Sequence, residues 1–159
     1  MENQLTVLSE SLDKKLKILN EIQEYNKKQE RSFLEETANL DEFDAAIDEK
    51  ERLIEQLNKL DEGFETVYEK LADELSGNRE KYRDQIRELQ DKIRLVTELG
   101  VSIQAQEQRN KKLVEQYFSK ERNHLRQERK KSKAAYEYYK RISASANINT
   151  APQFVDSKN

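Results

Sequence analysis

Apolar side chains recur in this sequence at alternating spacings of four and three residues from near the amino terminus to about residue 142, except over 119–133, where only Leu125 is clearly apolar. Such spacing returns side chains to one stripe of an α-helix and is typical of helices that pack side by side. The pattern divides into three segments and predicts helices over residues 3–37, 41–76 and 79–142. We therefore expect an all-α protein, an elongated antiparallel bundle or coiled coil of three long helices.

The composition supports this fold class. The chain has 159 residues, of which 38% are charged and 35% hydrophobic, with 3 glycines, 1 proline and no cysteine. An α/β or β-sandwich fold would need more turn residues and more β-branched and aromatic residues. No apolar run is long enough to span a bilayer or to form the core of a signal peptide. These features predict a cytoplasmic protein without membrane insertion and without disulfides.

Polar residues interrupt the apolar stripes. They are Lys15, Asn26 and Gln29 in the first segment, Lys50 and Asp61 in the second, and Glu107, Asn110 and Glu121 in the third. Three such positions leave the first helix weakly stable alone, so we expect it to need partner helices. Between segments, Asp41 is the expected N-cap of the second helix, and Gly77 the expected residue just past its end.

The third segment is longer than the other two. As one helix it would extend about 96 Å at 1.5 Å per residue, whereas the first two would reach about 50–55 Å. The last helix is therefore overlong and projects, or it bends near Gly100 and its second part packs separately. Residues 1–143 are expected to form one domain. Residues 144–159 show no helical repeat of apolar side chains, so we expect them to form a disordered tail.

Charge is unevenly distributed along the chain. Residues 1–108 carry 16 basic and 27 acidic side chains, whereas residues 109–143 carry 12 and 4. The basic run over 120–133 could contact the phosphates of a nucleic acid. The chain is acidic overall, however, and lacks a known motif that reads the grooves of DNA or RNA. Docking of this run on the acidic part of the chain, or on an acidic protein, is favoured over nucleic acid.

The sequence offers little for catalysis. It contains one histidine, no cysteine and no glycine-rich phosphate loop, so we expect no enzyme activity, cofactor or small-molecule substrate. Glu121 and His124 have the Glu-x-x-His spacing of di-iron bundles. Those sites need a second such motif, and His124 is the only histidine, so no metal site is expected.

An apolar stripe on the second part of the third segment has two interpretations. It includes Val114, Phe118, Leu125, Ala135, Tyr139 and Ile142. It is core if the helix folds back or if a homodimer forms along it. Otherwise it is a surface that accepts the amphipathic helix of a partner. Both interpretations stay open at this stage.

Three stretches resemble one family. They are the spaced leucines at the start of the chain, KERLIEQLNKLDEGFE (50–65) and IQAQEQRNKKLVEQ (103–116). Together they resemble bacterial flagellar export chaperones of the FlgN type. The resemblance implies a non-enzymatic cytoplasmic protein that binds the C-terminal helical segment of hook-associated proteins. It also implies that the client is kept unassembled and is delivered to the export gate.

The resemblance also implies a client site on the last helix. Its expected contacts are Leu113, Val114, Tyr117, Phe118 and Leu125, extending to Tyr136, Tyr139 and Ile142. An alternative with the same helices is a structural coiled coil, such as a stalk-like subunit of a secretion ATPase. Such a subunit is usually more basic overall than this chain.

Overall fold

A computed structural model describes residues 2–34, 38–120 and 125–144, with the side chains of 133–142 in the last range. These ranges hold four α-helices: α1 (Glu2–Leu34), α2 (Leu40–Gly77), α3 (Arg83–Lys120) and α4 (Leu125–Ala144). No strand occurs among the residues described, so the prediction of an all-α protein is confirmed. Residues 145–159, which make up nearly all of the predicted disordered tail, lie outside the described part.

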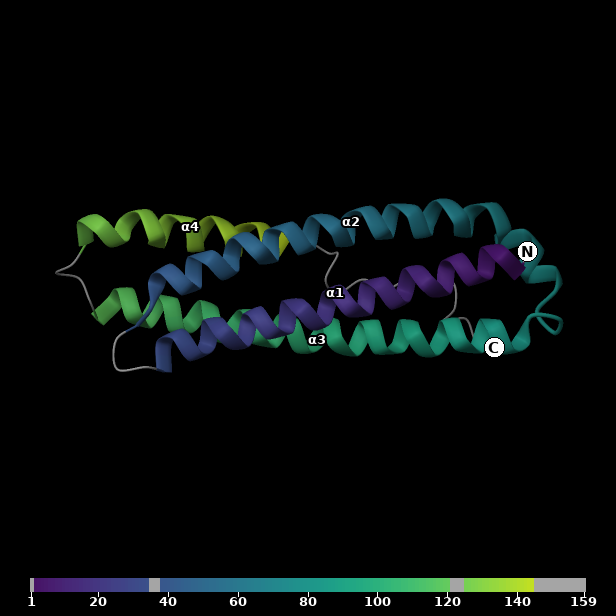
Figure 1. The fold of residues 1–159 in the computed structure, drawn as a ribbon, viewed down its shortest axis with the longest axis horizontal. Coiled ribbons are helices and arrows are strands. Elements are labelled where there is room, and N and C mark those ends of the chain that lie inside the picture. Colours follow the sequence, from purple (N-terminus) through teal and green to yellow (C-terminus); the bar gives the residue numbers. More distant parts are fainter. Residues whose placement is uncertain (1, 35–37, 121–124, 145–159) are drawn as a thin grey trace.

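The three long helices lie side by side, with α1 packed along both α2 and α3 (Figure 1). Lys15 of α1 pairs with Asp61 of α2, whereas the later Asn26 meets the earlier Lys50, so α1 and α2 are antiparallel. The helices α1 and α3 are parallel, because Ser9 contacts Glu88 while Gln23 meets Ser102.

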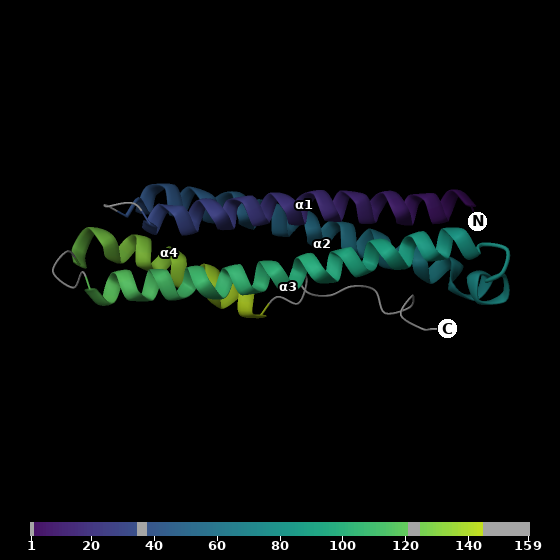
Figure 2. The same ribbon diagram turned by 90° about the horizontal axis from the view of Figure 1, so that it is seen from below.

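The fourth helix runs antiparallel to α3 and packs on α2 and α3. It lies at the end of the molecule that contains the last residues of α1 and the first residues of α2 (Figures 1 and 2). Among the described residues, one half of the molecule is therefore built from four helices and the other half from three. A pair between Arg141 of α4 and Glu51 of α2 joins the exposed sides of these helices.

The prediction of one helix over residues 79–142, projecting or bent near Gly100, is wrong. The helix α3 runs through Gly100, which is buried among its packing residues, and ends at Lys120, and a separate helix, α4, runs in the opposite direction. A glycine inside a helix costs about 1 kcal/mol relative to alanine, which the packing of α3 outweighs. The reversal lets Ala135 and Tyr138 become buried against α2 and α3.

Both predicted caps of α2 lie one or two residues from the observed ones. The N-cap is Asn39, whose side-chain oxygen accepts a hydrogen bond from the backbone N–H of Glu42 at 3.0 Å. Asp41 instead lies in the first turn, where its negative charge suits the helix dipole. At the other end Gly77 is the last helical residue, and Asn78 is the C-cap.

The described residues bury two apolar clusters. The larger one runs along α1, α2 and α3 and is rich in leucine. Its fully buried members include Leu8, Leu19, Ile22, Leu57, Leu71, Leu89, Val96 and Ile103. The smaller cluster lies where α4 packs and contains Phe43, Ile47, Val114, Ala135, Tyr138 and Tyr139. The packing of α4 therefore depends on a core of its own.

Replacing Asn39 with alanine tests the observed cap. We expect Asn39→Ala to lower the free energy of unfolding by about 1 kcal/mol, because the N–H of Glu42 loses its acceptor. Urea denaturation at pH 7 measures this change. Asp41→Ala is the matched control, and a larger loss for that variant than for Asn39→Ala would contradict the assignment.

Candidate functional site

Several residues of the predicted client site are packed inside the molecule. Val114 and Tyr139 are buried in the smaller apolar cluster, with Phe118 and Ile142 partly buried against it. Because Val114 and Phe118 belong to α3 while Tyr139 and Ile142 belong to α4, the predicted stripe consists of two surfaces that face each other.

The remaining predicted contacts lie outside this cluster. Leu113 and Tyr117 are half-buried, and the Tyr117 ring packs edge-on against Phe118 with 5.2 Å between ring centroids. Tyr136 points away from the packed face and is 69% exposed. The side chain of Leu125 lies outside the described part of the chain.

The surface that α4 covers is formed by α2 and α3. We call it the α4 groove. Its apolar members are Phe43 and Ile47 of α2 and Val114 of α3, and its polar members are Lys50 of α2 and Glu107 of α3. An amphipathic helix lies in this groove in the structure, and that helix is the chain's own α4.

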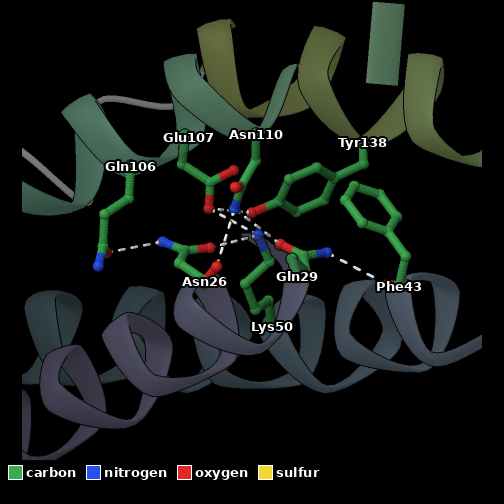
Figure 3. Close-up of polar contacts among 8 residues, drawn as sticks. All are labelled: Asn26, Gln29, Phe43, Lys50, Gln106, Glu107, Asn110 and Tyr138. Carbon is green, nitrogen blue, oxygen red and sulfur yellow. Dashed lines mark hydrogen bonds and ion pairs between the residues drawn. The ribbon is translucent and has the colours of Figure 1, made fainter. Parts of the chain in front are cut away.

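An ion pair lies buried in the α4 groove (Figure 3). The Nζ atom of Lys50 donates hydrogen bonds to Oε1 of Glu107 and to Oδ1 of Asn26, each at 2.7 Å. Tyr138 of α4 donates its hydroxyl to the same Glu107 oxygen at 2.6 Å. The relative exposure of Lys50 is 0% and that of Glu107 is 1%. One side chain from each of the four helices therefore meets at this point.

Amide side chains extend the network from α1 to α3. Asn26 donates through Nδ2 to Oε1 of Gln106 at 3.2 Å, and Asn110 donates to the backbone oxygen of Asn26 at 3.1 Å. Gln29 donates to the backbone oxygen of Phe43 at 3.2 Å (Figure 3). We call these residues, together with Lys50, Glu107 and Tyr138, the polar layer.

Desolvation dominates the electrostatics of the polar layer. Burial lowers the pKa of Lys50 to about 8, although the charge and hydrogen bond of Glu107 oppose this shift. Burial also raises the pKa of Tyr138 well above its usual value, and the neighbouring Glu107 charge raises it further. The ammonium group of Lys50 lies 4.3 Å from the centroid of the Tyr138 ring, a cation–π distance.

A second ion pair, partly buried, lies farther along α1 and α2, away from α4. Lys15 is 3% exposed and its Nζ atom is 2.8 Å from Oδ1 of Asp61. Burial raises the pKa of Asp61, and Lys15 partly offsets the shift. Polar residues on the apolar stripes of α1 and α2 therefore pair with each other at two places, Lys15 with Asp61 and Asn26 with Lys50.

The sequence pattern identified most residues of the polar layer but not Tyr138, which donates to Glu107 from α4. Asn26, Lys50 and Glu107 were all found as polar residues on apolar stripes. Tyr138 was not among the predicted contacts, because those followed the face that contains Tyr139. The signal for it is the spacing of three and four that joins Ala135, Tyr138 and Ile142.

Other kinds of site find no support in the described residues. No group of three or more potential metal ligands occurs among them, and Glu121 and His124 lie outside them. No described helix combines the length and apolar character needed to cross a membrane. Comparison of the chain with family models, with characterised proteins and with solved structures gives no match. The function must therefore be inferred from the geometry of the groove and from the sequence.

Removing one member of the buried ion pair should destabilise the protein. We expect Lys50→Met to lower the free energy of unfolding by about 3–5 kcal/mol, because Glu107 keeps a buried charge without its cation. The double variant Lys50→Met/Glu107→Met should recover more than half of that loss. Chemical denaturation of the three proteins at pH 7 gives the comparison, and additive losses in the double variant would contradict the pairing.

The stability of the protein should rise with pH above pH 8. Because the pKa of Lys50 is about 8 in the folded chain and 10.5 ordinarily, the unfolded chain binds more protons between these values. The gain is at most about 3 kcal/mol, at 1.36 kcal/mol per pKa unit. Above pH 10 the raised pKa values of Tyr138 and Tyr139 reverse the trend, since tyrosine then ionises in the unfolded chain.

Urea denaturation between pH 7 and 11 measures this dependence, with a maximum expected between pH 9 and 10. The double variant Lys50→Met/Glu107→Met serves as the control and should lack the rise. A steady fall in wild-type stability from pH 8 to 10 would contradict the burial of a charged Lys50.

Proposed function

We propose that this chain is a helix-binding chaperone whose α4 groove receives an amphipathic helix of a client protein. The observation that carries the proposal is α4 itself, which lies in the groove and buries Ala135, Tyr138 and Tyr139 there. A groove that accepts one amphipathic helix has the shape and apolar character to accept another. The proposed role is binding and protection, without enzymatic activity.

In this proposal α1, α2 and α3 form a rigid helical bundle, coiled-coil-like in its packing, that holds the two walls of the groove apart. The wall residues Phe43 and Ile47 come from α2, whereas Val114 comes from α3. The helix α1 packs along both α2 and α3 and so fixes their separation. The walls therefore keep their positions when the occupant of the groove changes.

The sequence resemblance to export chaperones of the FlgN type supplies the proposed client. The client is a flagellar hook-associated protein, bound through its C-terminal helical segment in the cytoplasm and handed to the export gate. Subunits that assemble through amphipathic helices would polymerise too early if those helices stayed exposed. A chaperone that buries the same apolar stripe reversibly prevents this.

The position of α4 divides the expected client contacts into two groups. Val114 of α3 is retained as a contact in the proposal because it belongs to the groove, and Phe118 is retained because it packs beside the same apolar cluster. Tyr139 and Ile142 belong to the helix that occupies it, so a client helix competes with them. Since α4 is covalently attached, its local concentration at the groove is high. The client can bind only those molecules in which α4 has left the groove, so its apparent affinity is the intrinsic affinity multiplied by the fraction of open grooves.

Substitutions in the groove and in α4 should therefore change client affinity in opposite directions. In the background of Tyr139→Ala, where α4 competes less, we expect Val114→Ala to weaken binding about tenfold, through the loss of an apolar contact worth about 1–2 kcal/mol. Tyr139→Ala should strengthen binding, because it weakens the competing α4. The measurement is calorimetric titration of each full-length variant with the C-terminal segment of a hook-associated protein from the same genome.

Tyr136→Ala is a matched control, since it removes the same side chain from the exposed side of α4 and should leave affinity unchanged. Weaker binding by Tyr139→Ala would mean that α4 contacts the client directly. If no variant and no wild-type protein bound the segment, the proposed client would be wrong.

A further inference from the structure

Among the described residues, the α4 groove is apolar except at one point. There the buried carboxylate of Glu107 and the ammonium group of Lys50 face the fourth helix, and Tyr138 covers both (Figure 3). The tyrosine hydroxyl donates to Glu107, while the face of its ring lies against Lys50. Among the described side chains of α4, Ala135 and Tyr139 also lie in the smaller apolar cluster, and Ile142 packs against it.

A helix that covers this point must satisfy two charged groups at once. Glu107 needs a hydrogen-bond donor, because a buried carboxylate that loses a donor is strongly disfavoured. Lys50 already donates to Glu107 and Asn26, and it gains an electron-rich ring face from Tyr138. A phenol supplies both a donor and a ring face, whereas leucine or phenylalanine lacks the donor.

Glu107 also has unused acceptor capacity. Its Oε1 atom accepts from Lys50 and from Tyr138, whereas its Oε2 atom is buried and accepts no hydrogen bond from the residues described. The groove therefore holds a carboxylate oriented toward the occupying helix and able to accept from it. An apolar helix would leave this carboxylate more poorly satisfied than α4 does.

We propose that the α4 groove selects partner helices that carry a tyrosine over Glu107 and Lys50. The partner's pattern follows the residues that α4 presents: a small residue at the position of Ala135, tyrosine at that of Tyr138, and apolar residues at those of Tyr139 and Ile142. This inference rests on the proposed function, because it names the class of helix that the groove binds. It makes Glu107 and Lys50 specificity-determining residues of the groove.

A peptide titration tests the selection. The receptor is the full-length chain with Tyr138→Ala and Tyr139→Ala, which weaken its own α4 while leaving the groove residues intact. The probes are two synthetic peptides with the sequence of residues 125–144, one native and one with phenylalanine in place of Tyr138. We expect the native peptide to bind at least about tenfold more tightly, as a hydrogen bond to a charged group implies.

Two matched controls test whether the preference comes from the Tyr138 hydroxyl. A third peptide with phenylalanine in place of the exposed Tyr136 should bind like the native one. A second receptor that also carries Lys50→Met and Glu107→Met should show no preference for tyrosine over phenylalanine. Circular dichroism of both receptors checks that α1, α2 and α3 remain helical.

The outcomes separate this inference from the proposed function. Equal affinity of the native peptide and its phenylalanine variant for the first receptor would overturn the selection and leave a helix-binding groove. Failure of all peptides to bind either receptor would overturn both the selection and the groove as a binding site. A tyrosine preference on the first receptor that disappears on the second supports the inference.

A second measurement needs no change in the groove. In the full-length chain, Tyr138→Phe should increase hydrogen exchange of the amides over residues 133–142 by about tenfold or more, because α4 leaves the groove more often. Tyr136→Phe should leave exchange unchanged. Equal exchange in the two variants would show that the hydroxyl does not hold a helix in the groove, and would overturn the selection.

Discussion

The contact between Lys50 and Glu107 is the interaction on which the packing of all four helices depends. The lysine comes from α2 and the glutamate from α3, while Asn26 of α1 and Tyr138 of α4 complete their hydrogen bonds. A shift of any one helix by a single turn, about 5.4 Å, would separate these groups and leave buried charges unpaired. The polar layer therefore fixes the register of helices whose leucine stripes alone would tolerate sliding.

This register has an energetic cost, and the cost fits the proposed role of the groove. Burying two charges is unfavourable, and apolar residues of similar volume at these positions would often be equally stable or more so. An apolar groove, however, would hold any amphipathic helix of suitable width. A charged pair at its centre makes the occupancy of the groove depend on one complementary side chain, which gives selectivity and keeps the affinity moderate. The reversible binding that an export chaperone requires is consistent with this design.

The sequence predicted the first two helices well, and the third helix and the candidate site only in part. The helices α1 and α2 begin and end within about three residues of the predicted bounds, because caps and periodicity act within a few residues. The client-site prediction placed Val114 and Tyr139 on one continuous face, whereas they belong to two helices that pack against each other. Residues 79–142 contain no proline, and their only glycine lies inside α3, so no local signal indicated where the chain reverses.

By itself, the sequence determined that the chain is helical and which side of each helix is buried. Both follow from backbone hydrogen bonds between residues four apart and from a repeat of 3.6 residues per turn, which are local properties. Only the tertiary structure decided that the polar residues on those stripes are partners, and that α4 lies in the groove. Lys50 and Glu107 are 57 residues apart in the chain, and Tyr138 lies 31 residues beyond Glu107. Such pairs are chosen by how whole helices pack and by the cost of leaving a buried charge unpaired, which no local pattern records.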